Sequence, residues 1–399
     1  MKPVEIQPDI FWIGVNDTAT RLFEGLWPIE KEGISYNSYL IRDEKTILVD
    51  ICKDFLSEAY LECLQEVVDP QRIDAIILNH LEPDHSGAIR ALHQAAPQAS
   101  LITSAKGAKM LADFFGISDP IQVVGDGEVL STGKHALQFI MAPMVHWPET
   151  MMTYETTTGT LFSCDAFGGY GKLEGGIFDG DHADLSFYET ESLRYFANIV
   201  AAFSKPVLNA AAKLAGLDIR TIAPSHGLVW RKDPGRILNL YLKWSTYSTG
   251  QAEKGITLLH GSMYGNTARM TAAVEEELKS AGIPYTSHDV TTEHISYILP
   301  SLWVNQGVLI GAPTYEGSLF PTMALVLQMA EIKRVFHKQA GYYGSYGWGG
   351  GAVRHLNHAF EALKWTLVDT LDFAGQPEPD DLQQCGTLVK HVWEQVNRA

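Results

Sequence analysis

Short apolar runs alternate with amphipathic segments along most of the chain. In the first part, the runs TILVDI, AIILNH, SLITS and TLFSCD have the length and composition of buried strands, and residues 55–68 have the pattern of an amphipathic helix. From residue 255 onward the order becomes regular. The strand-like runs GITLLHGS, YTSHDV, QGVLIGAPT and AGYYGSYGW are separated by helical segments, the first over residues 267–280. Strands that alternate with helices predict an open parallel sheet covered on both faces.

A polar stretch, KWSTYSTGQAEKG at residues 243–255, separates these two parts and precedes a fresh strand pattern. A chain of 399 residues is also long for one core, although a large single α/β domain is the alternative. We therefore predict two domains, residues 1–250 and residues 255–399.

Composition narrows the class of partner. A formal net charge of −17 argues against nucleic acid and against an anionic membrane surface, because both attract clustered Lys and Arg. Glu5 and Asp9 fall where a signal peptide needs an apolar core, and no run is long enough to span a bilayer. We expect a cytoplasmic protein without a membrane partner. The four cysteines form no C-x-x-C pair, so any metal must use nitrogen and oxygen ligands.

One turn concentrates groups that can bind a metal. It is NHLEPDHSG at residues 79–87, directly after the apolar run AIIL, and it carries His80, Glu82, Asp84 and His85. The pattern predicts that a strand ends near Asn79, that Pro83 holds the turn open, and that a helix opens near Ser86 as its N-cap.

Three further candidate ligands follow at wide spacing: His146 in MVHWPETM, Asp165 in LFSCDAFGGYG and His226 in IAPSHGLVW. Each follows or ends an apolar run. Here the chain resembles the metallo-β-lactamase fold, whose signature is H-x-H-x-D-H, except that Glu82 replaces the second histidine. With that change the pattern is similar to that of the flavodiiron proteins, or A-type flavoproteins.

The resemblance implies a diiron centre. It assigns His80, Glu82 and His146 to one iron, Asp84, His85 and His226 to the other, and Asp165 to both as a bridge. In some members of this family the histidine that matches His85 swings away from the metal. Three carboxylates and one bridging hydroxide would balance two divalent ions, as a buried site requires. Ligand softness alone leaves iron, manganese and zinc open.

Isolated histidines have a plainer interpretation. A single His-rich turn is more often a solvated or hydrogen-bonded cluster than a metal site, and we interpret the remaining candidates in this way: His93, His135, His182 and His260. The seven residues together, each in the sequence context of the family, favour a metal centre.

The second part contains a phosphate-binding pattern. In LLHGSMYGNTARM, a loop rich in glycine and hydroxyl groups lies between a strand and a helix N-terminus, where backbone N–H groups and the helix dipole can hold a phosphate. It is neither a Walker loop nor G-x-G-x-x-G, and it resembles the phosphate loop of flavodoxins, although alone it could be an ordinary βα turn. Its residues are Ser262, Met263, Tyr264, Gly265, Asn266 and Thr267.

Two more loops fall where flavodoxins clamp the isoalloxazine ring, so the resemblance implies FMN as cofactor. Their glycines allow close backbone approach, and Tyr315 or Trp348 could cover the ring. The candidate residues are Pro313, Thr314, Tyr315, Glu316 and Gly317 in GAPTYEG, and Ser345, Tyr346, Gly347, Trp348 and Gly349 in GSYGWGGGA.

The resemblance covers essentially the whole chain and implies an N-terminal metallo-β-lactamase-like αββα sandwich, followed by a flavodoxin-like doubly wound parallel sheet. Two irons and reduced FMN together hold four electrons. Reducing dioxygen to water consumes four, and coupling two nitric oxide molecules to nitrous oxide consumes two; these gases are the substrates of the family. Because the chain carries no rubredoxin or flavin reductase extension, we expect an external donor such as rubredoxin or a reduced deazaflavin. The family also implies a head-to-tail homodimer or a dimer of dimers.

One departure from the family lies near the N-terminus. Many members have F-H-G-Y there, but this chain has FEGLW, with Glu24 and Leu26 in place of the histidine and tyrosine, and Trp27 next. If the segment reaches the iron pocket, Glu24 could relay protons and Trp27 could shape the substrate cavity. The alternative is an ordinary strand-edge hairpin.

Two other functions stay open on the sequence. One is a dizinc or dimanganese hydrolase with a non-redox α/β module. The other is a flavodoxin-like carrier that docks through a catalytically silent metal domain. Metal content and flavin colour distinguish the hydrolase from the oxidoreductase, because the hydrolase would be a colourless zinc protein. Gas consumption distinguishes the carrier from the oxidoreductase, because the carrier would consume neither gas.

Overall fold

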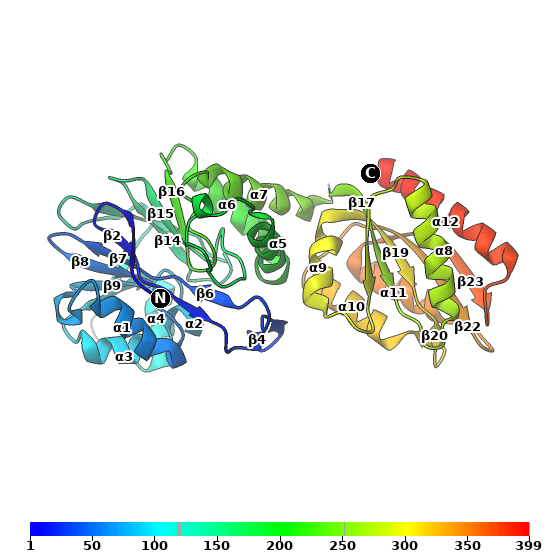
Figure 1. The fold of residues 1–399 in the computed structure, drawn as a ribbon, viewed down its shortest axis with the longest axis horizontal. Coiled ribbons are helices and arrows are strands. Elements are labelled where there is room, and N and C mark those ends of the chain that lie inside the picture. The colour runs from blue at the N-terminus through cyan, green and yellow to red at the C-terminus, as the bar shows by residue number, and fades with distance from the viewer. Residues whose placement is uncertain (118–120, 251, 399) are drawn as a thin grey trace. The chain divides into compact units, whose positions relative to one another are not determined.

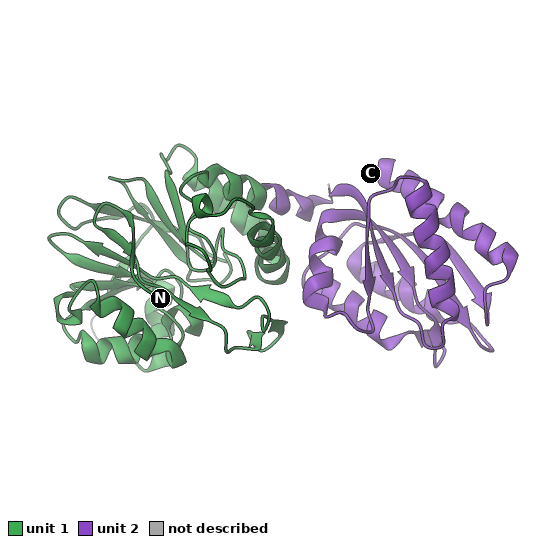
Figure 2. Ribbon diagram, in the orientation of Figure 1, with its two compact units in different colours: residues 1–242 green, residues 243–399 purple. Residues whose placement is uncertain are grey.

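The computed structural model describes residues 1–117, 121–250 and 252–398. The chain forms two compact units, Met1–Leu242 and Lys243–Ala399 (Figure 2). The division falls within α7 (Pro234–Thr246), at the start of the predicted linker. Gln251 of that linker and Ala399 at the end of the second predicted domain lie outside the described residues.

The first unit contains a seven-stranded sheet in the order β1-β2-β7-β8-β9-β10-β11. Strands β8 to β11 are parallel to one another, and the other neighbours are antiparallel. The strands are β1 (Val4–Gln7), β2 (Ile10–Trp12), β7 (Tyr39–Arg42), β8 (Thr46–Val49), β9 (Ala75–Ile77), β10 (Ser100–Ser104) and β11 (Ile121–Val124).

A second sheet of five strands completes this unit, in the order β12-β13-β14-β15-β16, with only β15 and β16 parallel. Its strands are β12 (Val129–Ser131), β13 (Ala136–Met141), β14 (Met151–Glu155), β15 (Thr160–Cys164) and β16 (Thr221–Pro224). Two small hairpin-like pairs lie beside the sheets: β3 (Val15–Asp17) with β6 (Ile34–Tyr36), and β4 (Leu22–Phe23) with β5 (Trp27–Pro28).

Helices cover both outer faces of this unit. Figure 1 shows α1, α3 and α4 beside the seven-stranded sheet, and α5, α6 and α7 beside the five-stranded sheet. The helices besides α7 are α1 (Ser57–Gln65), α2 (Pro83–Ser86), α3 (Ile89–Ala95), α4 (Ala105–Phe115), α5 (Ser186–Tyr195) and α6 (Ser204–Leu214). This arrangement confirms the predicted αββα sandwich.

The second unit is built on one parallel sheet, β18-β17-β19-β22-β23. Counted along the chain, this order is 2-1-3-4-5, which is the flavodoxin order and confirms the predicted doubly wound fold. The strands are β17 (Glu253–His260), β18 (Tyr285–Asp289), β19 (Asn305–Gly311), β22 (Gln339–Tyr346) and β23 (Thr366–Ala374), with a small hairpin of β20 (Thr314–Tyr315) and β21 (Ser318–Leu319).

Five helices flank that sheet (Figure 1), and the first agrees with the helix predicted over residues 267–280. They are α8 (Asn266–Ser280), α9 (Ile295–Val304), α10 (Pro321–Ile332), α11 (Ala352–Leu363) and α12 (Pro379–Arg398). Apolar residues of α8 and α12, such as Val274 and Val392, pack with Ile256 and Leu309 of the central strands into one core.

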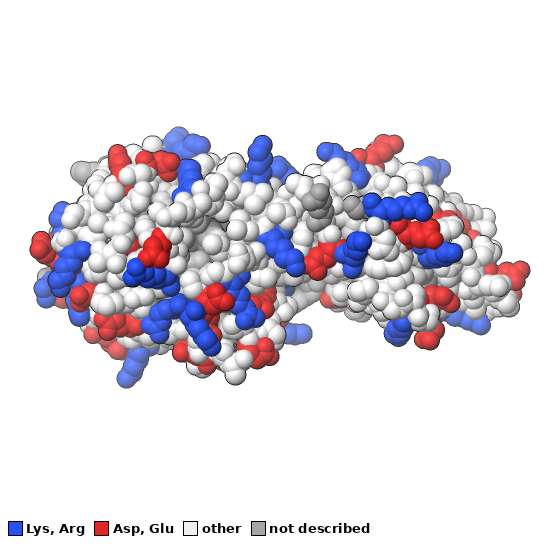
Figure 3. Space-filling view, turned by 90° about the horizontal axis from the view of Figure 1, so that it is seen from above, with Lys and Arg blue, Asp and Glu red and all other residues white. Residues whose placement is uncertain are grey.

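Within the described residues, none of the helices combines the length and apolar composition that a bilayer-spanning helix needs. On the face drawn in Figure 3, Lys and Arg side chains are interspersed with Asp and Glu side chains, so this face carries no continuous basic stripe.

Candidate metal centre and flavin pocket

The seven predicted metal ligands come from four chain segments of the first unit. His80 and Glu82 lie in the turn after β9, and Asp84 and His85 lie in α2. Asp165 directly follows β15, a strand that is buried along its whole length. The remaining two are His146, between β13 and β14, and His226, just after β16.

The turn after β9 differs from its predicted form. The strand ends at Ile77, and the helix opens at Pro83, the first-turn position at which proline is tolerated. Ser86 is the last residue of α2 and not an N-cap, because its Oγ donates to the carbonyl oxygens of Leu81 and Glu82, 2.9 and 2.8 Å away. This hydroxyl closes the turn that presents the ligands.

The structure brings all seven side chains into one buried cluster. Ligand atoms of His80, Glu82, His146 and Asp165 lie within 4.8 Å of one another, as do those of Asp84, His85 and His226. The nearest oxygens of Asp165 are 2.9 Å from His85 Nε2, 3.3 Å from His80 Nε2, and 3.4 Å from Nε2 of both His146 and His226. Asp165 therefore touches both groups.

The cluster contains buried polar atoms that protein groups do not satisfy. Among the described residues, these atoms have no hydrogen-bond partner: Asp84 Oδ1 and Oδ2, Asp165 Oδ2, His85 Nδ1 and His226 Nε2. Such atoms are costly in a protein interior. Cations at the centre would satisfy the carboxylate oxygens and the Nε2 atom, so the residues present fit a pair of metal ions.

Opposite charges stabilise each other in this cluster. Burial opposes ionisation of Asp165, but the charge of His85 and contacts with His146 hold its pKa well below its usual range. Burial likewise opposes protonation of His146 and His226, but their carboxylate neighbours raise the two pKa values to about 9 and about 10. Without a bound metal, protons on these imidazoles would balance the carboxylates, and divalent cations would displace these protons on binding.

A second layer of contacts orients the ligands, and sequence analysis missed it. Glu149 Oε1 lies 2.6 Å from His80 Nδ1 and accepts the backbone N–H of Leu81 at 3.0 Å. His226 Nδ1 lies 2.8 Å from the carbonyl oxygen of Ser35. The sequence offers one indication of Glu149, because this residue lies in the same HWPET run as His146. Nothing in the sequence indicates Ser35.

Aromatic side chains wall the centre. Tyr195, the last residue of α5 before the π-helical turn Phe196–Val200, donates its hydroxyl to Asp165 Oδ1 at 2.9 Å. The ring of Phe23 in β4 meets the ring of His226 edge-on, with centroids 5.7 Å apart, and also contacts Tyr170. Sequence analysis named neither Tyr195 nor Phe23.

The hairpin of β4 and β5 therefore reaches the centre through Phe23. Glu24 is exposed at its tip, and its Oε2 accepts the indole N–H of the fully buried Trp27 at 2.9 Å. Glu24 has a φ of 52°, a left-handed conformation that is uncommon for this residue type. The two predicted residues thus bond to each other in the segment that carries Phe23.

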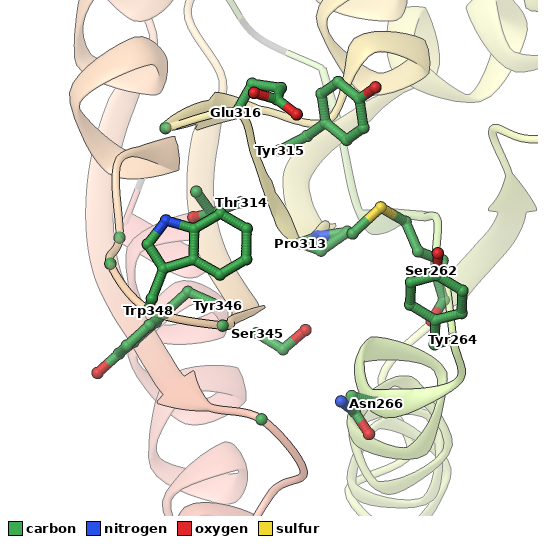
Figure 4. A pocket seen from close by; sticks show the side chains of 16 residues that line it. Ser262, Tyr264, Asn266, Pro313, Thr314, Tyr315, Glu316, Ser345, Tyr346 and Trp348 are labelled. Carbon is green, nitrogen blue, oxygen red and sulfur yellow. The ribbon is translucent and has the colours of Figure 1, made fainter.

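In the second unit, the three predicted loops surround one cavity of about 540 Å³, a size typical of cofactor sites. Figure 4 shows Ser262, Tyr264 and Asn266 across this cavity from Trp348. The predicted residues that line it are Ser262, Met263, Tyr264, Asn266, Pro313, Thr314, Tyr315, Glu316, Gly317, Ser345, Tyr346, Gly347, Trp348 and Gly349.

Two predicted residues do not line the cavity. Gly265, with φ +95°, is the N-cap of α8, and Thr267 is buried in its first turn, 3.2 Å from Ser345 Oγ. Sequence analysis missed two lining residues, Gly350 and Gly375. Two aromatic side chains stand almost fully exposed at the cavity, Tyr264 at 91% and Trp348 at 97%. Exposed rings beside a helix N-terminus fit a planar, phosphate-bearing cofactor.

Comparison with known proteins agrees with this architecture. Residues 34–227 match the family described as ODP family beta lactamase, and residues 258–386 match the flavodoxin family. The chain is 32% identical over 398 residues to the nitric oxide reductase of Moorella thermoacetica, covering 98% of both chains.

Solved structures show the same two-part architecture. Rubredoxin oxygen:oxidoreductase from Desulfovibrio gigas superposes with a TM-score of 0.93 at 27% identity, over 100% of this chain and 99% of the other. The flavodiiron protein from Giardia intestinalis superposes with a TM-score of 0.92 at 26% identity, over 100% and 98%. The fold, the two matched families and the full-length relatives together show that this chain belongs to the flavodiiron protein family.

Proposed function

We propose that this protein is an oxidoreductase that reduces nitric oxide to nitrous oxide, dioxygen to water, or both. The observation that carries the proposal is the pair of buried ligand groups that share Asp165. Two metals held side by side can present a substrate to both ions at once. Zinc would give such a pair no redox capacity, whereas iron in a chain that also carries a flavodoxin-type pocket gives the protein a way to take up and deliver electrons.

Each ligand has a proposed place. His80, Glu82 and His146 hold one iron, Asp84, His85 and His226 hold the other, and Asp165 binds both. When bound, the iron pair supplies the redox chemistry at which the gas is reduced. The protein side chains hold the ions, exclude bulk water from a buried site and set the local charge.

For the flavin, we propose that the backbone of residues 262–267 and the N-terminus of α8 hold the FMN phosphate. The loops that contain Tyr315 and Trp348 hold the ring. Support comes from the shared cavity and from the glycines Gly347 and Gly349, at which an added Cβ would meet no atom within 4 Å. Such open backbone lets a flat ring approach closely.

The β4–β5 hairpin is proposed to form part of the substrate pocket. Phe23 and Tyr195 supply a rigid wall against the ligands, and buried Trp27 pairs with Phe23 across the hairpin. Exposed Glu24 can exchange protons with solvent, and we propose that it relays them toward the pocket. Its placement beside Trp27 supports this role.

Exposed apolar residues and the family relatives support a proposal about the protein partners. Leu22 and Leu26 on the hairpin are exposed, as are Tyr315 and Trp348 at the flavin cavity. Apolar side chains that are exposed together on one surface are typical of interaction sites. We propose a head-to-tail homodimer, alone or paired as a dimer of dimers, that brings each flavin beside the partner's irons, and an external donor such as rubredoxin or a reduced deazaflavin.

The test starts from fully loaded protein that is kept under anaerobic conditions, with reduced FMN as electron source. Nitric oxide or dioxygen is then supplied separately, and turnover is measured. The proposal predicts nitrous oxide from nitric oxide, water from dioxygen, or both. Consumption of neither gas by protein that contains iron and FMN would support a carrier. Hydrolytic turnover by a zinc-loaded, colourless protein would support the hydrolase.

A further inference from the structure

Three of the four histidines of the metal centre can be compared by the contact made by the ring nitrogen that faces away from the centre. His80 Nδ1 meets the carboxylate of Glu149 at 2.6 Å, whereas His226 Nδ1 meets only a backbone carbonyl, that of Ser35, at 2.8 Å. His85 Nδ1 is buried and has no hydrogen-bond partner within the described residues. The strongest outer contact therefore belongs to the His80 group.

Glu149 is held firmly in this position. It is 2% exposed, and the same oxygen that meets His80 accepts the N–H of Leu81 at 3.0 Å. Its backbone carbonyl accepts the hydroxyl of Ser104 at 2.7 Å. Two contacts hold the carboxylate at Oε1 and a third holds the backbone of the same residue, so this oxygen has little freedom to move and constrains the ring of His80.

This contact decides which nitrogen of His80 is available. With Nδ1–H donated to Glu149, the lone pair on Nε2 points at the centre, where Nε2 lies 3.3 Å from both Glu82 and Asp165. A carboxylate behind a histidine also makes the imidazole a stronger electron donor to a metal. The ring of His85 has neither advantage.

We propose that Glu149 is a positioning residue that makes the His80, Glu82 and His146 position the tighter of the two metal positions. The two metals then bind with unequal affinity, the first at this position and the second at Asp84, His85 and His226. The inference rests on the proposed function only in requiring two metal ions, and it holds for iron, cobalt or zinc.

The experiment removes metal from the loaded protein with increasing chelator and measures bound metal by elemental analysis, with cobalt(II) absorbance as a second readout. Wild-type protein should release its metals in two steps. Glu149→Gln keeps the volume and an acceptor oxygen but removes the charge. It should weaken the tighter position about 10- to 100-fold and leave the weaker one unchanged, so that the steps merge.

The chain offers a matched control. Glu155 is also a fully buried carboxylate of the first unit that faces a histidine, with Oε1 3.2 Å from His135 Nδ1, but it contacts none of the seven ligands in the described interactions. Glu155→Gln should leave both release steps at their wild-type chelator concentrations. A similar weakening in both variants would mean that loss of a buried charge, and not the contact with His80, is responsible.

Two further results would overturn the inference: a single release step in wild-type protein, or two unchanged steps in Glu149→Gln protein. Circular dichroism and FMN retention establish that each variant is folded. If Glu149→Gln fails to fold, Glu149→Asp is the substitute, because it keeps the charge but withdraws the carboxylate from His80 by one methylene. Metal affinity at the tighter position should still fall, while affinity at the other position stays the same. If the protein releases its metals in two unequal steps but consumes neither gas, this inference is supported and the proposed function is contradicted.

Discussion

The two carboxylate oxygens of Asp165 face different histidines of the buried cluster. Oδ1 is the nearer oxygen to His85 and His226, at 2.9 and 3.4 Å, and Oδ2 is the nearer to His80 and His146, at 3.3 and 3.4 Å. The hydroxyl of Tyr195 fixes Oδ1 at 2.9 Å. A carboxylate placed in this way has one oxygen for each of two cations, which supports its proposed bridging role.

Asp165→Ala should therefore lose both metals while it keeps FMN, because both positions lose a charged ligand and the flavin pocket lies in the other unit. Iron analysis and flavin absorbance of the same sample check this prediction. Asp165→Asn is the companion variant, since it keeps the shape and removes the charge. A full iron complement with normal turnover in Asp165→Ala protein would show that Asp165 does not bridge.

Glu24→Gln tests the proposed proton relay. The amide can still accept the indole N–H of Trp27 through its oxygen, so the hairpin should stay in place. We expect turnover to fall about 100-fold, at the lower end of general acid–base effects, while iron content stays normal. Glu30→Gln is the control: Glu30 is exposed nearby and 3.6 Å from Arg21. Equal turnover in both variants would leave Glu24 as a hairpin residue only.

At this scale, residue types and spacing marked the cluster of four side chains in one turn, and the resemblance to a family joined the three distant side chains to it. The contacts of Glu149, Ser35 and Tyr195 could not be predicted, because each joins residues that are distant in the sequence: Ser35 meets His226 across 191 positions, and Glu149 meets His80 across 69. Such contacts arise from the packing of two sheets, and no local pattern encodes them.

At the scale of elements, the phosphate loop depends on the junction of β17 and α8. Gly265 adopts φ +95° as the N-cap of α8, a backbone conformation that side-chain-bearing residues rarely adopt. The pattern of glycine, hydroxyl groups and a following helix predicted this junction, because each feature is local. The turn after β9 was harder, since the hydroxyl of Ser86 bonds back to its own turn instead of capping the next helix.

Gly265→Val should weaken FMN binding about 10-fold or more, because a β-branched residue strains this conformation and shifts the N–H groups that would hold the phosphate. Gly282→Val is a matched control just beyond the other end of α8, where φ is +63° and an added Cβ would also meet nothing. Both variants should lose similar stability, but only Gly265→Val should lose FMN affinity in a fluorescence titration. Equal FMN loss would contradict the phosphate role.

Lys338, just before β22, gives the second unit a pH-dependent stability. Burial lowers the pKa of its amine to about 7, and its Nζ donates to the carbonyl of Trp303 at 3.0 Å. In the unfolded chain the pKa returns to about 10.4, so the unfolded state binds more protons between these values. The free energy of unfolding should therefore rise as pH increases from about 7 toward 10.

Lys338→Met should remove this slope and stabilise the unit at neutral pH by roughly 1 to 3 kcal/mol, after allowance for the lost hydrogen bond. Urea unfolding at several pH values, followed by FMN release, measures the effect. Lys390→Met serves as control, since Lys390 is exposed on α12 and should leave the slope unchanged. An identical pH dependence in Lys338→Met and wild-type protein would exclude Lys338 as its source.

At the scale of the whole molecule, the chain joins two units of different architecture. The metal ligands of the first unit come from both of its sheets, because His80 follows β9 in one while Asp165 and His226 follow β15 and β16 in the other. The alternation of strands and helices predicted the parallel sheet of the second unit directly. For the first unit, the pattern of runs alone did not give the two-sheet sandwich, and resemblance to a family supplied it.

The most direct test is the iron, zinc and flavin content of the purified protein, measured with its visible spectrum. We predict two irons and one FMN per chain, with a yellow colour that bleaches on reduction and returns when nitric oxide or dioxygen is added. A colourless protein with two zinc ions per chain, or one whose reduced flavin is unaffected by either gas, would contradict the account.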